Sequence, residues 1–434
     1  MRVGIWGHFH GGNFGDDLVV RTLIEGLRRR DPAAEIVAFA QAPDSASELH
    51  GVPAVPIHAN YRPGLDYQRP TFWRRHGGWL PLRALRYLVR LAIALLREPV
   101  FMLRGYRRLK KLDLVVVAGS GQLQDTYAGP FGMPFTAFKW ALAARLAGTP
   151  MMFLGVGVGP RVVTPIGRFF LRNALRLSPH VSVRDRVSAD VAESLTGERY
   201  PEIPDMAFAL DVSRTAVRRA AGERGVVGMN TMAWAEPGLW RDGDLGRYEA
   251  YRAKLVEFVE WTVRSDLDVV LFSSVPTTDG RMADEIVAIL EDRLTTGELA
   301  HVRRPQIERP ADFFEVVEAC DLVVSERFHS VVLPTLLGTP VVALAYEPKT
   351  WHVMGQLDRS DFVLDINDFT VPELIALVER TRRDTAASSR QAARAEELRR
   401  RVDAEFDRVF DPAQPLATRK RGRHAVDAGQ THRA

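Results

Sequence analysis

The chain has 434 residues, which is too long for one ordinary hydrophobic core and fits two domains better. Apolar residues make up 46% and charged residues 26% of the chain, so its composition is that of a globular protein and not of a disordered or fibrous one. The formal net charge is only +4, and the single cysteine, Cys320, excludes a disulfide framework and a cysteine-based zinc site and is typical of a reducing cytoplasm.

The amino-terminal residues MRVGIWG are typical of a β-strand and lack the apolar segment and cleavage site of a secretory signal. The nearest candidate for a spanning helix, Tyr87 to Leu103, is interrupted by Arg90, Arg97 and Glu98. We therefore expect no membrane-spanning helix and a cytoplasmic protein.

Short apolar runs alternate with Gly-rich or polar turns and amphipathic helices along the chain. The first series has predicted strands at Val3–Trp6, Ile36–Ala40, Asp113–Ala118, Met151–Val156 and Val181–Val183, and helices at Asp16–Arg30, at Pro134–Ala147 and from about Asp185. The second series has predicted strands at Val226–Met229, Val269–Phe272, Leu322–Val324 and Val341–Ala345, and helices near Arg247–Arg264, Gly280–Arg293 and His329–Leu337. This alternation predicts an α/β fold of two Rossmann-like domains with parallel sheets, whose ligand crevices lie at the carboxyl ends of the strands.

The stretch Leu210–Arg224 lacks clear periodicity and is rich in Arg and Ala, so we place the domain boundary there. The expected domains are residues 1–210 and 225–410, the second ending in a mostly helical stretch from Pro372 to Phe410. Residues 411–434 are polar and basic and are expected to form a disordered tail.

Residues 74–111 form a basic amphipathic insertion in the first domain, with eleven Lys and Arg residues and one acid, Glu98. Such a segment can lie on an anionic bilayer, which would make the protein peripheral on the inner membrane face. It can equally pack on the first domain with its arginines solvated. We expect no nucleic-acid partner, because no recognised nucleic-acid module accompanies the charge.

Two loops that follow predicted strands of the first domain are rich in glycine. In the first, Gly7–Asp17, Asp16 and Asp17 stand at a helix start, where they suit N-capping or the binding of sugar hydroxyls. The alternative interpretation of this loop is a simple strand-to-helix turn. We expect no metal binding by its histidines, because histidines in loops are often simply exposed to solvent.

In the second glycine-rich loop, Ala118–Asp125, Gly119 and Gly121 can present backbone donors. Gln124 and Asp125 can bond sugar hydroxyls, or Asp125 can act as a base. The alternative to these functional roles is that the loop only caps a helix.

Three further motifs bring cations and a histidine to the ends of predicted strands. In Ser182–Asp185, Arg184 offers a planar fork for a carboxylate or phosphate, or forms an ion pair with Asp185 or Asp205. The other two motifs follow strands of the second domain. In Ser325–Ser330, Arg327 and His329 stand at a strand-to-helix junction, where His329 can exchange a proton or simply fill space. In Ala345–Thr350, Glu347 and Lys349 can reach the same crevice or lie in a solvated loop.

These motifs, in this order, resemble the polysaccharide pyruvyl transferase family from Val3 to about Gln356. Ser120 interrupts the usual triple-glycine loop, and the 74–111 insertion is larger than the family pattern. The matching segments are Gly12–Asp17, Gly119–Asp125, Gly155–Pro160, Ser182–Asp185, Arg327–His329 and Tyr346–Lys349.

The resemblance implies a GT-B-like fold in which two domains face a cleft. It also implies transfer of the enolpyruvyl carbons of phosphoenolpyruvate to a sugar, with formation of a ketal and release of phosphate, and neither a metal nor a cofactor. The implied acceptor is a sugar of a cell-surface polysaccharide or of its lipid-linked precursor. By resemblance, the donor site comprises Arg184, Arg327, Lys349, Gly119 and Gly121, the acceptor site Asn13, Asp16 and Gln124, and the acid/base groups His329 with Asp125 or Asp17.

Two other functions stay open at this point. A GT-B nucleotide-sugar glycosyltransferase would share the fold and the cleft, with an acid such as Glu347 on the ribose. A non-catalytic polysaccharide assembly protein would use the cleft for binding alone.

Overall fold

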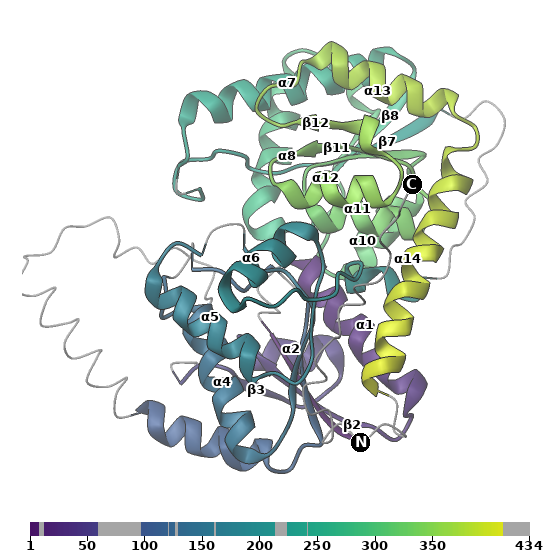
Figure 1. Cartoon of the computed structure of the whole chain (residues 1–434). Helices are drawn as coiled ribbons and strands as arrows, with labels where there is room; N and C mark the ends of the chain where they lie inside the picture. Colours follow the sequence, from purple (N-terminus) through teal and green to yellow (C-terminus); the bar gives the residue numbers. More distant parts are fainter. Residues whose placement is uncertain are drawn as a thin grey trace, which may run out of the picture.

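The computed structural model describes residues 1–7, 13–59, 97–119, 121–125, 129–159, 162–212, 224–240 and 242–410. Within them the strands form two six-stranded sheets, one in each half of the chain, and the halves are stacked one above the other (Figure 1). The strands of the first sheet are β1 (Arg2–Trp6), β2 (Glu35–Ala40), β3 (Ala54–Pro56), β4 (Leu114–Val117), β5 (Met151–Val156) and β6 (Val181–Val183). Those of the second are β7 (Gly225–Asn230), β8 (Leu267–Phe272), β9 (Val302–Arg303), β10 (Leu322–Ser325), β11 (Val341–Ala345) and β12 (Val363–Asp365).

Helices follow most strands. Those of the first half are α1 (Phe14–Arg30), α2 (Pro43–His50), α4 (Met133–Ala147), α5 (Pro165–Leu177), α6 (Arg186–Thr196) and the 3₁₀ turn η2 (Met206–Ala209). Those of the second half are α7 (Leu245–Arg264), α8 (Pro276–Glu291), α9 (Thr296–Leu299), α10 (Pro310–Glu318), α11 (Phe328–Leu336), α12 (Pro348–Gln356), η3 (Ser360–Phe362), α13 (Val371–Arg383) and α14 (Ala387–Phe410). None of the helices in the described parts of the chain is long and apolar enough to cross a bilayer.

Both sheets have the same strand order. The first runs β3-β2-β1-β4-β5-β6 and the second β9-β8-β7-β10-β11-β12, and all pairings are parallel. This is the Rossmann order, in which the direction of winding reverses beside the first strand of each sheet. The predicted α/β fold with two Rossmann-like units is therefore confirmed.

Burial on both faces explains why the central strands are continuously apolar. The four residues of β4 and the six of β5 are all buried. Along β4, Val116 packs with α1 in one hydrophobic cluster, while Val115 and Val117 belong to another cluster that includes α4 and α5. Alternate side chains thus serve opposite faces of the sheet, and each needs a helix layer to cover it.

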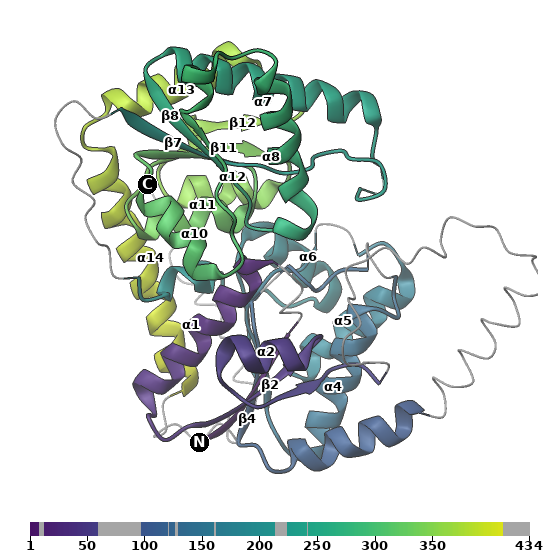
Figure 2. The same cartoon turned by 180° about the vertical axis from the view of Figure 1, so that it is seen from behind.

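One hydrophobic cluster joins the two halves. It runs from α1 through η2 to the second sheet and includes Phe406 and Phe410 of α14. Figures 1 and 2 show α14 running along one side of the molecule from the second half down to α1. Gly26 allows α1 and α14 to pack closely, because a Cβ at this position would lie only 2.6 Å from the Phe406 ring.

The predicted elements start and end near the observed residues, and β5, β6 and β11 coincide with the predicted strands, but helices α2, α5, α10 and α12 were not predicted. Strands β3, β9 and β12 are missing from the prediction because they have two or three residues and none is fully buried, whereas β6, also of three residues, is a fully buried run. Residues 74–96 of the insertion and the 411–434 tail lie outside the described residues, while residues 97–109 are helical. The domain limits 1–210 and 225–410 stay a prediction, and α14 contacts both sides of them.

Candidate active site

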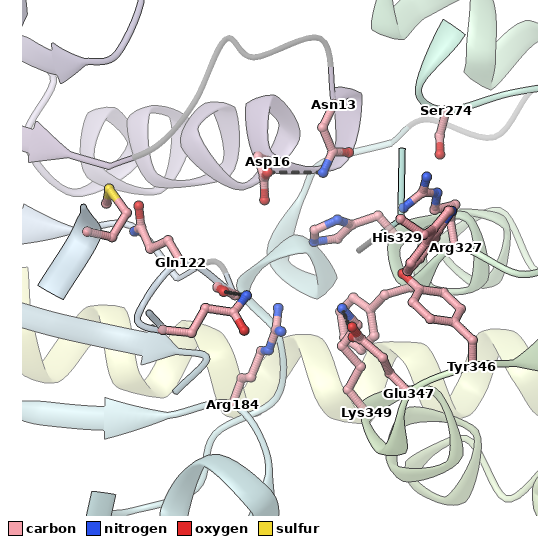
Figure 3. A pocket seen from close by; sticks show the side chains of 15 residues that line it. Asn13, Asp16, Gln122, Arg184, Ser274, Arg327, His329, Tyr346, Glu347 and Lys349 are labelled. Carbon is pink, nitrogen blue, oxygen red and sulfur yellow. Dashed lines mark hydrogen bonds and ion pairs between the residues drawn. The ribbon is translucent and has the colours of Figure 1, made fainter. Parts of the chain in front are cut away.

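A cavity of about 440 Å³ lies between the two halves, at the carboxyl ends of both sheets (Figure 3). This size is within the range of small-molecule sites. The first half contributes Asn13, Asp16, Gly121, Gln122, Gln124, Met133 and Arg184, and the second contributes Trp240, Ser274, Arg327, Phe328, His329, Tyr346, Glu347 and Lys349.

Arg184 leaves the end of β6 and is held by acids behind it. Its Nε donates to Asp185 Oδ2 at 3.3 Å, and Nη1 lies 3.6 Å from Asp205 Oδ2. Burial alone would lower the pKa of Arg184, but these two acids raise it overall, so the guanidinium stays charged. The intradomain pairing left open by the sequence is thus present, and it fixes the cation where it still lines the cavity.

Glycine makes room for this guanidinium. A Cβ at Gly121 would lie 3.0 Å from Arg184 Nη2, and one at Gly157 would lie 2.8 Å from Nε. The glycine-rich loops after β4 and β5 therefore let the backbone approach an arginine. No side chain larger than hydrogen fits at Gly157 without displacing Arg184.

Arg327 follows β10 and is held by a buried acid on α8. Its Nη2 lies 2.6 Å from Asp279 Oδ2, and its Nε donates to the same oxygen at 2.8 Å. Burial opposes the charge, but Asp279 and Tyr346 raise the pKa of Arg327 above its ordinary value. A half-buried guanidinium held at two of its nitrogens by one carboxylate oxygen is a rigid donor for an anion in the cavity.

Lys349 and Arg184 approach the same aromatic ring from opposite halves. The guanidinium of Arg184 lies 4.8 Å from the centroid of Phe328, and Nζ of Lys349 lies 6.0 Å from it. Lys349 also pairs with Glu347. Burial by itself would lower the pKa of Lys349, yet Tyr346 and Glu347 raise it overall, so the ammonium remains charged in the cavity.

His329, in the first turn of α11, is packed between the two halves. Its Nε2 faces Asp205 Oδ1 at 3.8 Å, beyond hydrogen-bond distance, and makes no hydrogen bond to the described residues. Burial would raise the pKa of Asp205, but His329 and Arg184 lower it overall, so a carboxylate faces the imidazole. On its other side the ring touches Gly15 of α1, where a Cβ would lie 2.0 Å from Nδ1.

The start of α1 completes the wall opposite His329. Asn13 caps the helix by accepting a hydrogen bond from Gly15 N at 3.1 Å, and its Nδ2 donates to Asp16 Oδ2 at 3.0 Å. The Phe14 N–H donates to the Ser274 carbonyl of the second half at 3.2 Å. Figure 3 shows Asp16 and His329 pointing into the space between the halves.

Three residues expected at the site lie elsewhere. Asp17 is buried on another side of α1, where Oδ1 is 3.9 Å from His50 Nε2. Asp125 accepts hydrogen bonds from Val163 N, Thr164 N and Thr164 Oγ1, so it anchors the turn before α5. Gly119 packs against the backbone of β5, since a Cβ there would be 2.5 Å from the Gly155 carbonyl oxygen. We do not keep these three in the proposed site.

Several neighbours of the site had no local signal in the sequence. Asp279 lies in an ordinary amphipathic helix, and Trp240 lies between β7 and α7 in a segment that no motif marks. Gly15 belongs to a recognised glycine motif, but its contact partner is more than 300 residues away in the chain. No cluster of three metal-binding side chains occurs among the described residues.

Glu326, beside Arg327, is a buried carboxyl turned away from the cavity. It is fully buried, and the Tyr251 hydroxyl donates to its Oε1 at 2.6 Å. Burial raises the pKa of Glu326 to about 8, so the folded protein holds it protonated at neutral pH. The unfolded chain ionises this group near the ordinary carboxyl value, so its contribution to stability is full below that value and is lost as pH rises through about 8.

We therefore expect Glu326→Gln to flatten the pH dependence of stability. Between the two pKa values the wild-type protein should lose about 1.4 kcal/mol of unfolding free energy per pH unit from this group, because only the unfolded state has released the proton. The measurement is denaturant unfolding at several pH values, with the exposed Glu249→Gln as control. Parallel pH profiles for all three proteins would contradict the assignment.

Comparison with known proteins agrees with this geometry. The family described as polysaccharide pyruvyl transferase matches residues 13–348. The amylovoran biosynthesis protein AmsJ of Erwinia amylovora is 24% identical over 429 residues, which cover 92% of this chain and 96% of AmsJ.

Solved structures share the fold at low identity. The UDP-GlcNAc 2-epimerase of Neisseria meningitidis, bound to UDP-GlcNAc, is 13% identical with a TM-score of 0.55 and covers 95% of this chain and 100% of its own. MurG of Acinetobacter baumannii is 14% identical with a TM-score of 0.51, covering 94% and 99%. These likenesses show a GT-B-like fold, and the family match over more than half of the sequence shows that the chain belongs to the polysaccharide pyruvyl transferase family.

Proposed function

We propose that the protein moves a pyruvyl group from phosphoenolpyruvate onto a sugar of a cell-surface polysaccharide, or of its lipid-linked precursor, forming a ketal and releasing phosphate. The observation that carries the proposal is the meeting of Arg184, Arg327 and Lys349 with His329 in one cavity between the halves. Phosphoenolpyruvate is a small polyanion, and burying it requires cations that offset the loss of its hydration.

The proposed reaction needs one proton donor and one proton acceptor. A proton is added to the methylene carbon of phosphoenolpyruvate, and a sugar hydroxyl adds to the neighbouring carbon. The bond from that carbon to the phosphate oxygen then breaks, and a second hydroxyl takes its place. Of the two hydroxyl protons, one balances the proton added to carbon and the other leaves with phosphate.

His329 is our proposed proton donor, because an imidazole can both donate and accept a proton and this one lies beside the cations of the donor site. Asp16 is our proposed partner for the acceptor hydroxyls. It replaces Asp17 and Asp125 in that role because it lines the cavity, and Asn13 orients its carboxylate.

An aromatic cluster on the second half supports a sugar acceptor. Trp240 lines the cavity and packs 4.6 Å from Trp234 and 5.5 Å from Tyr346, measured between ring centroids. Such rings offer a flat apolar surface beside polar groups, which suits the mixed surface of a sugar ring.

We expect phosphoenolpyruvate to raise the thermal unfolding midpoint of the wild-type protein and not of Arg327→Ala. A ligand at 100 times its Kd adds about 2.7 kcal/mol to stability. Removing Arg327 leaves Asp279 unpaired, so the shift caused by the ligand is compared, and not the midpoint itself. Arg309→Ala, which removes an exposed arginine of the same half paired with Asp312, is the control and should keep the shift.

A panel of nucleotide-sugars separates the alternatives. If only a nucleotide-sugar stabilises the wild-type protein, the reaction is glycosyl transfer. Arg184, Arg327 and Lys349 then do not bind phosphoenolpyruvate. If phosphoenolpyruvate binds without phosphate release in the presence of any acceptor fraction, a non-catalytic assembly role is favoured.

A further inference from the structure

Helices α4 and α5 carry a row of large apolar side chains on the first half, some of them exposed and others half-buried. On α4 and just before it, Phe131, Phe135, Phe138, Leu142 and Leu146 follow at intervals of three and four residues, which places them on one helix face. Phe131 is 67% exposed and Leu146 is 68% exposed. An exposed apolar face of this kind marks a contact surface.

The neighbouring helix α5 extends this face. Phe169 and Ile166 are 56% and 48% exposed, and Val163, just before the helix, is 63% exposed. The rings of the two helices touch, since Phe170 lies 5.9 Å from Phe131 and 5.5 Å from Phe138 between centroids. The apolar side chains thus form one continuous surface, which we call the α4–α5 face.

The charge on these two helices has one sign. Neither Met133–Ala147 nor Pro165–Leu177 contains an Asp or a Glu. They carry Lys139, Arg145, Arg168, Arg172 and Arg176, of which Arg145, Arg168 and Arg172 are exposed.

The helical residues 97–109 border this face, because Nζ of Lys139 on α4 lies 5.5 Å from the ring centroid of Phe101 and 5.7 Å from that of Phe135. They add the exposed Val100 and Leu103, and the exposed arginines 104, 107 and 108. The apolar surface is therefore edged by cations on more than one side.

We propose that the α4–α5 face docks on an anionic lipid bilayer. Aromatic and aliphatic side chains surrounded by arginines match the acyl boundary and the charged headgroups of such a surface. A second copy of this chain is a poorer fit, because a symmetric dimer through the same face would bring its arginines against one another. The sequence left open whether residues 74–111 contact a membrane or pack on the first domain; the proposal centres the contact on α4 and α5 and keeps residues 97–109 at its edge.

The face begins at the cavity. Met133, the first residue of α4, lines the cavity wall, and Phe131 starts the exposed row just before it. Asp125 follows the cavity-lining Gln122 and Gln124 in the chain and holds the Val163–Thr164 turn at the start of α5. Docking would place the cavity close to the bilayer surface, where a lipid-linked sugar is presented. This last step rests on the proposed function, whereas membrane docking itself does not.

The test is co-sedimentation of the full chain with phosphatidylcholine vesicles, with and without phosphatidylglycerol. We expect binding to the anionic vesicles, weakened by salt, and little binding to the neutral ones. The variant Arg168→Glu/Arg172→Glu should partition at least about tenfold more weakly. The control Arg400→Glu/Arg401→Glu makes the same charge change on exposed residues of α14, on the far side of the molecule in Figures 1 and 2, and should bind like wild type.

A second pair of variants tests the apolar contribution. Phe131→Ser/Phe169→Ser should lose binding by a similar factor, whereas Leu239→Ser/Leu245→Ser, which replaces exposed leucines of the second half, should keep it. Equal binding of all variants, or equal binding to neutral and anionic vesicles, would overturn the proposal. The proposal would also be overturned if Phe131→Ser/Phe169→Ser changed the oligomeric state but left vesicle binding intact. The face would then be a contact between two copies of the chain. If phosphoenolpyruvate still stabilises each variant, a change in vesicle binding concerns the α4–α5 face alone and leaves the proposed function untouched.

Discussion

Replacing His329 with glutamine is expected to lower kcat at least about a hundredfold while phosphoenolpyruvate still stabilises the protein. The glutamine side chain fills much of the space of the imidazole but cannot deliver a proton at neutral pH. The cations that hold the donor, Arg184, Arg327 and Lys349, remain in place. The loss should therefore appear in turnover and not in donor binding.

Phosphate release from phosphoenolpyruvate with an acceptor fraction measures this turnover. The control is His301→Gln, a partly exposed histidine of the second half that pairs with Asp268 at 2.9 Å and lies outside the cavity lining. Near-normal activity of His329→Gln would remove His329 from the acid/base role and would point to Asp16 or Glu347 as the proton donor.

Replacing Gly15 with alanine is the second change with a large expected effect. The new Cβ would lie 2.0 Å from His329 Nδ1 and 2.2 Å from its Cγ, so α1 and the imidazole have to move apart. Overpacking of this kind destabilises a protein by about 1–3 kcal/mol. A displacement of about 1 Å at the reacting group can lower kcat by about a hundredfold.

A double-mutant cycle separates this contact from a general loss of stability. A Cβ at position 15 would also lie 2.5 Å from the Cβ of residue 329, so the background has to be His329→Gly, in which neither the imidazole nor that Cβ remains and the cost of Gly15→Ala in unfolding free energy should largely vanish. Gly297→Ala is the matched control, because a Cβ there meets no atom within 4 Å. If Gly15→Ala destabilises both backgrounds equally, the Gly15–His329 contact does not explain the glycine.

Gly15 also changes the interpretation of the first glycine-rich loop. Such a loop after β1 suggests close approach of a ligand to the backbone, but at Gly15 the approaching group is a side chain from the other half. At Gly121 and Gly157 the approaching group is also a side chain, Arg184, but it comes from the same half. Glycine in these loops permits the halves and their cations to come together, and the cavity is the space that remains between them.

The sequence by itself determined the α/β class, the two series of strands and helices, and the position of each motif after a strand. These follow from apolar periodicity and turn residues, which depend on neighbours within a few positions. Because parallel strands share one carboxyl edge, strand order led us to expect Arg327, His329 and Lys349 of the second half in one crevice, and the family resemblance added Arg184 of the first half. The structure brings these four side chains to a single cavity.

Only the tertiary structure decided which polar residues of each motif face that cavity. Asp16 and Asp17 are adjacent in the sequence, but successive residues of a helix point in directions about 100° apart, so only Asp16 lines the cavity. Asp125 turns to the backbone before α5, and Asp279 arrives from a helix with no motif at all. The exposure of the α4–α5 face likewise depends on what the rest of the chain leaves uncovered, which no local pattern encodes.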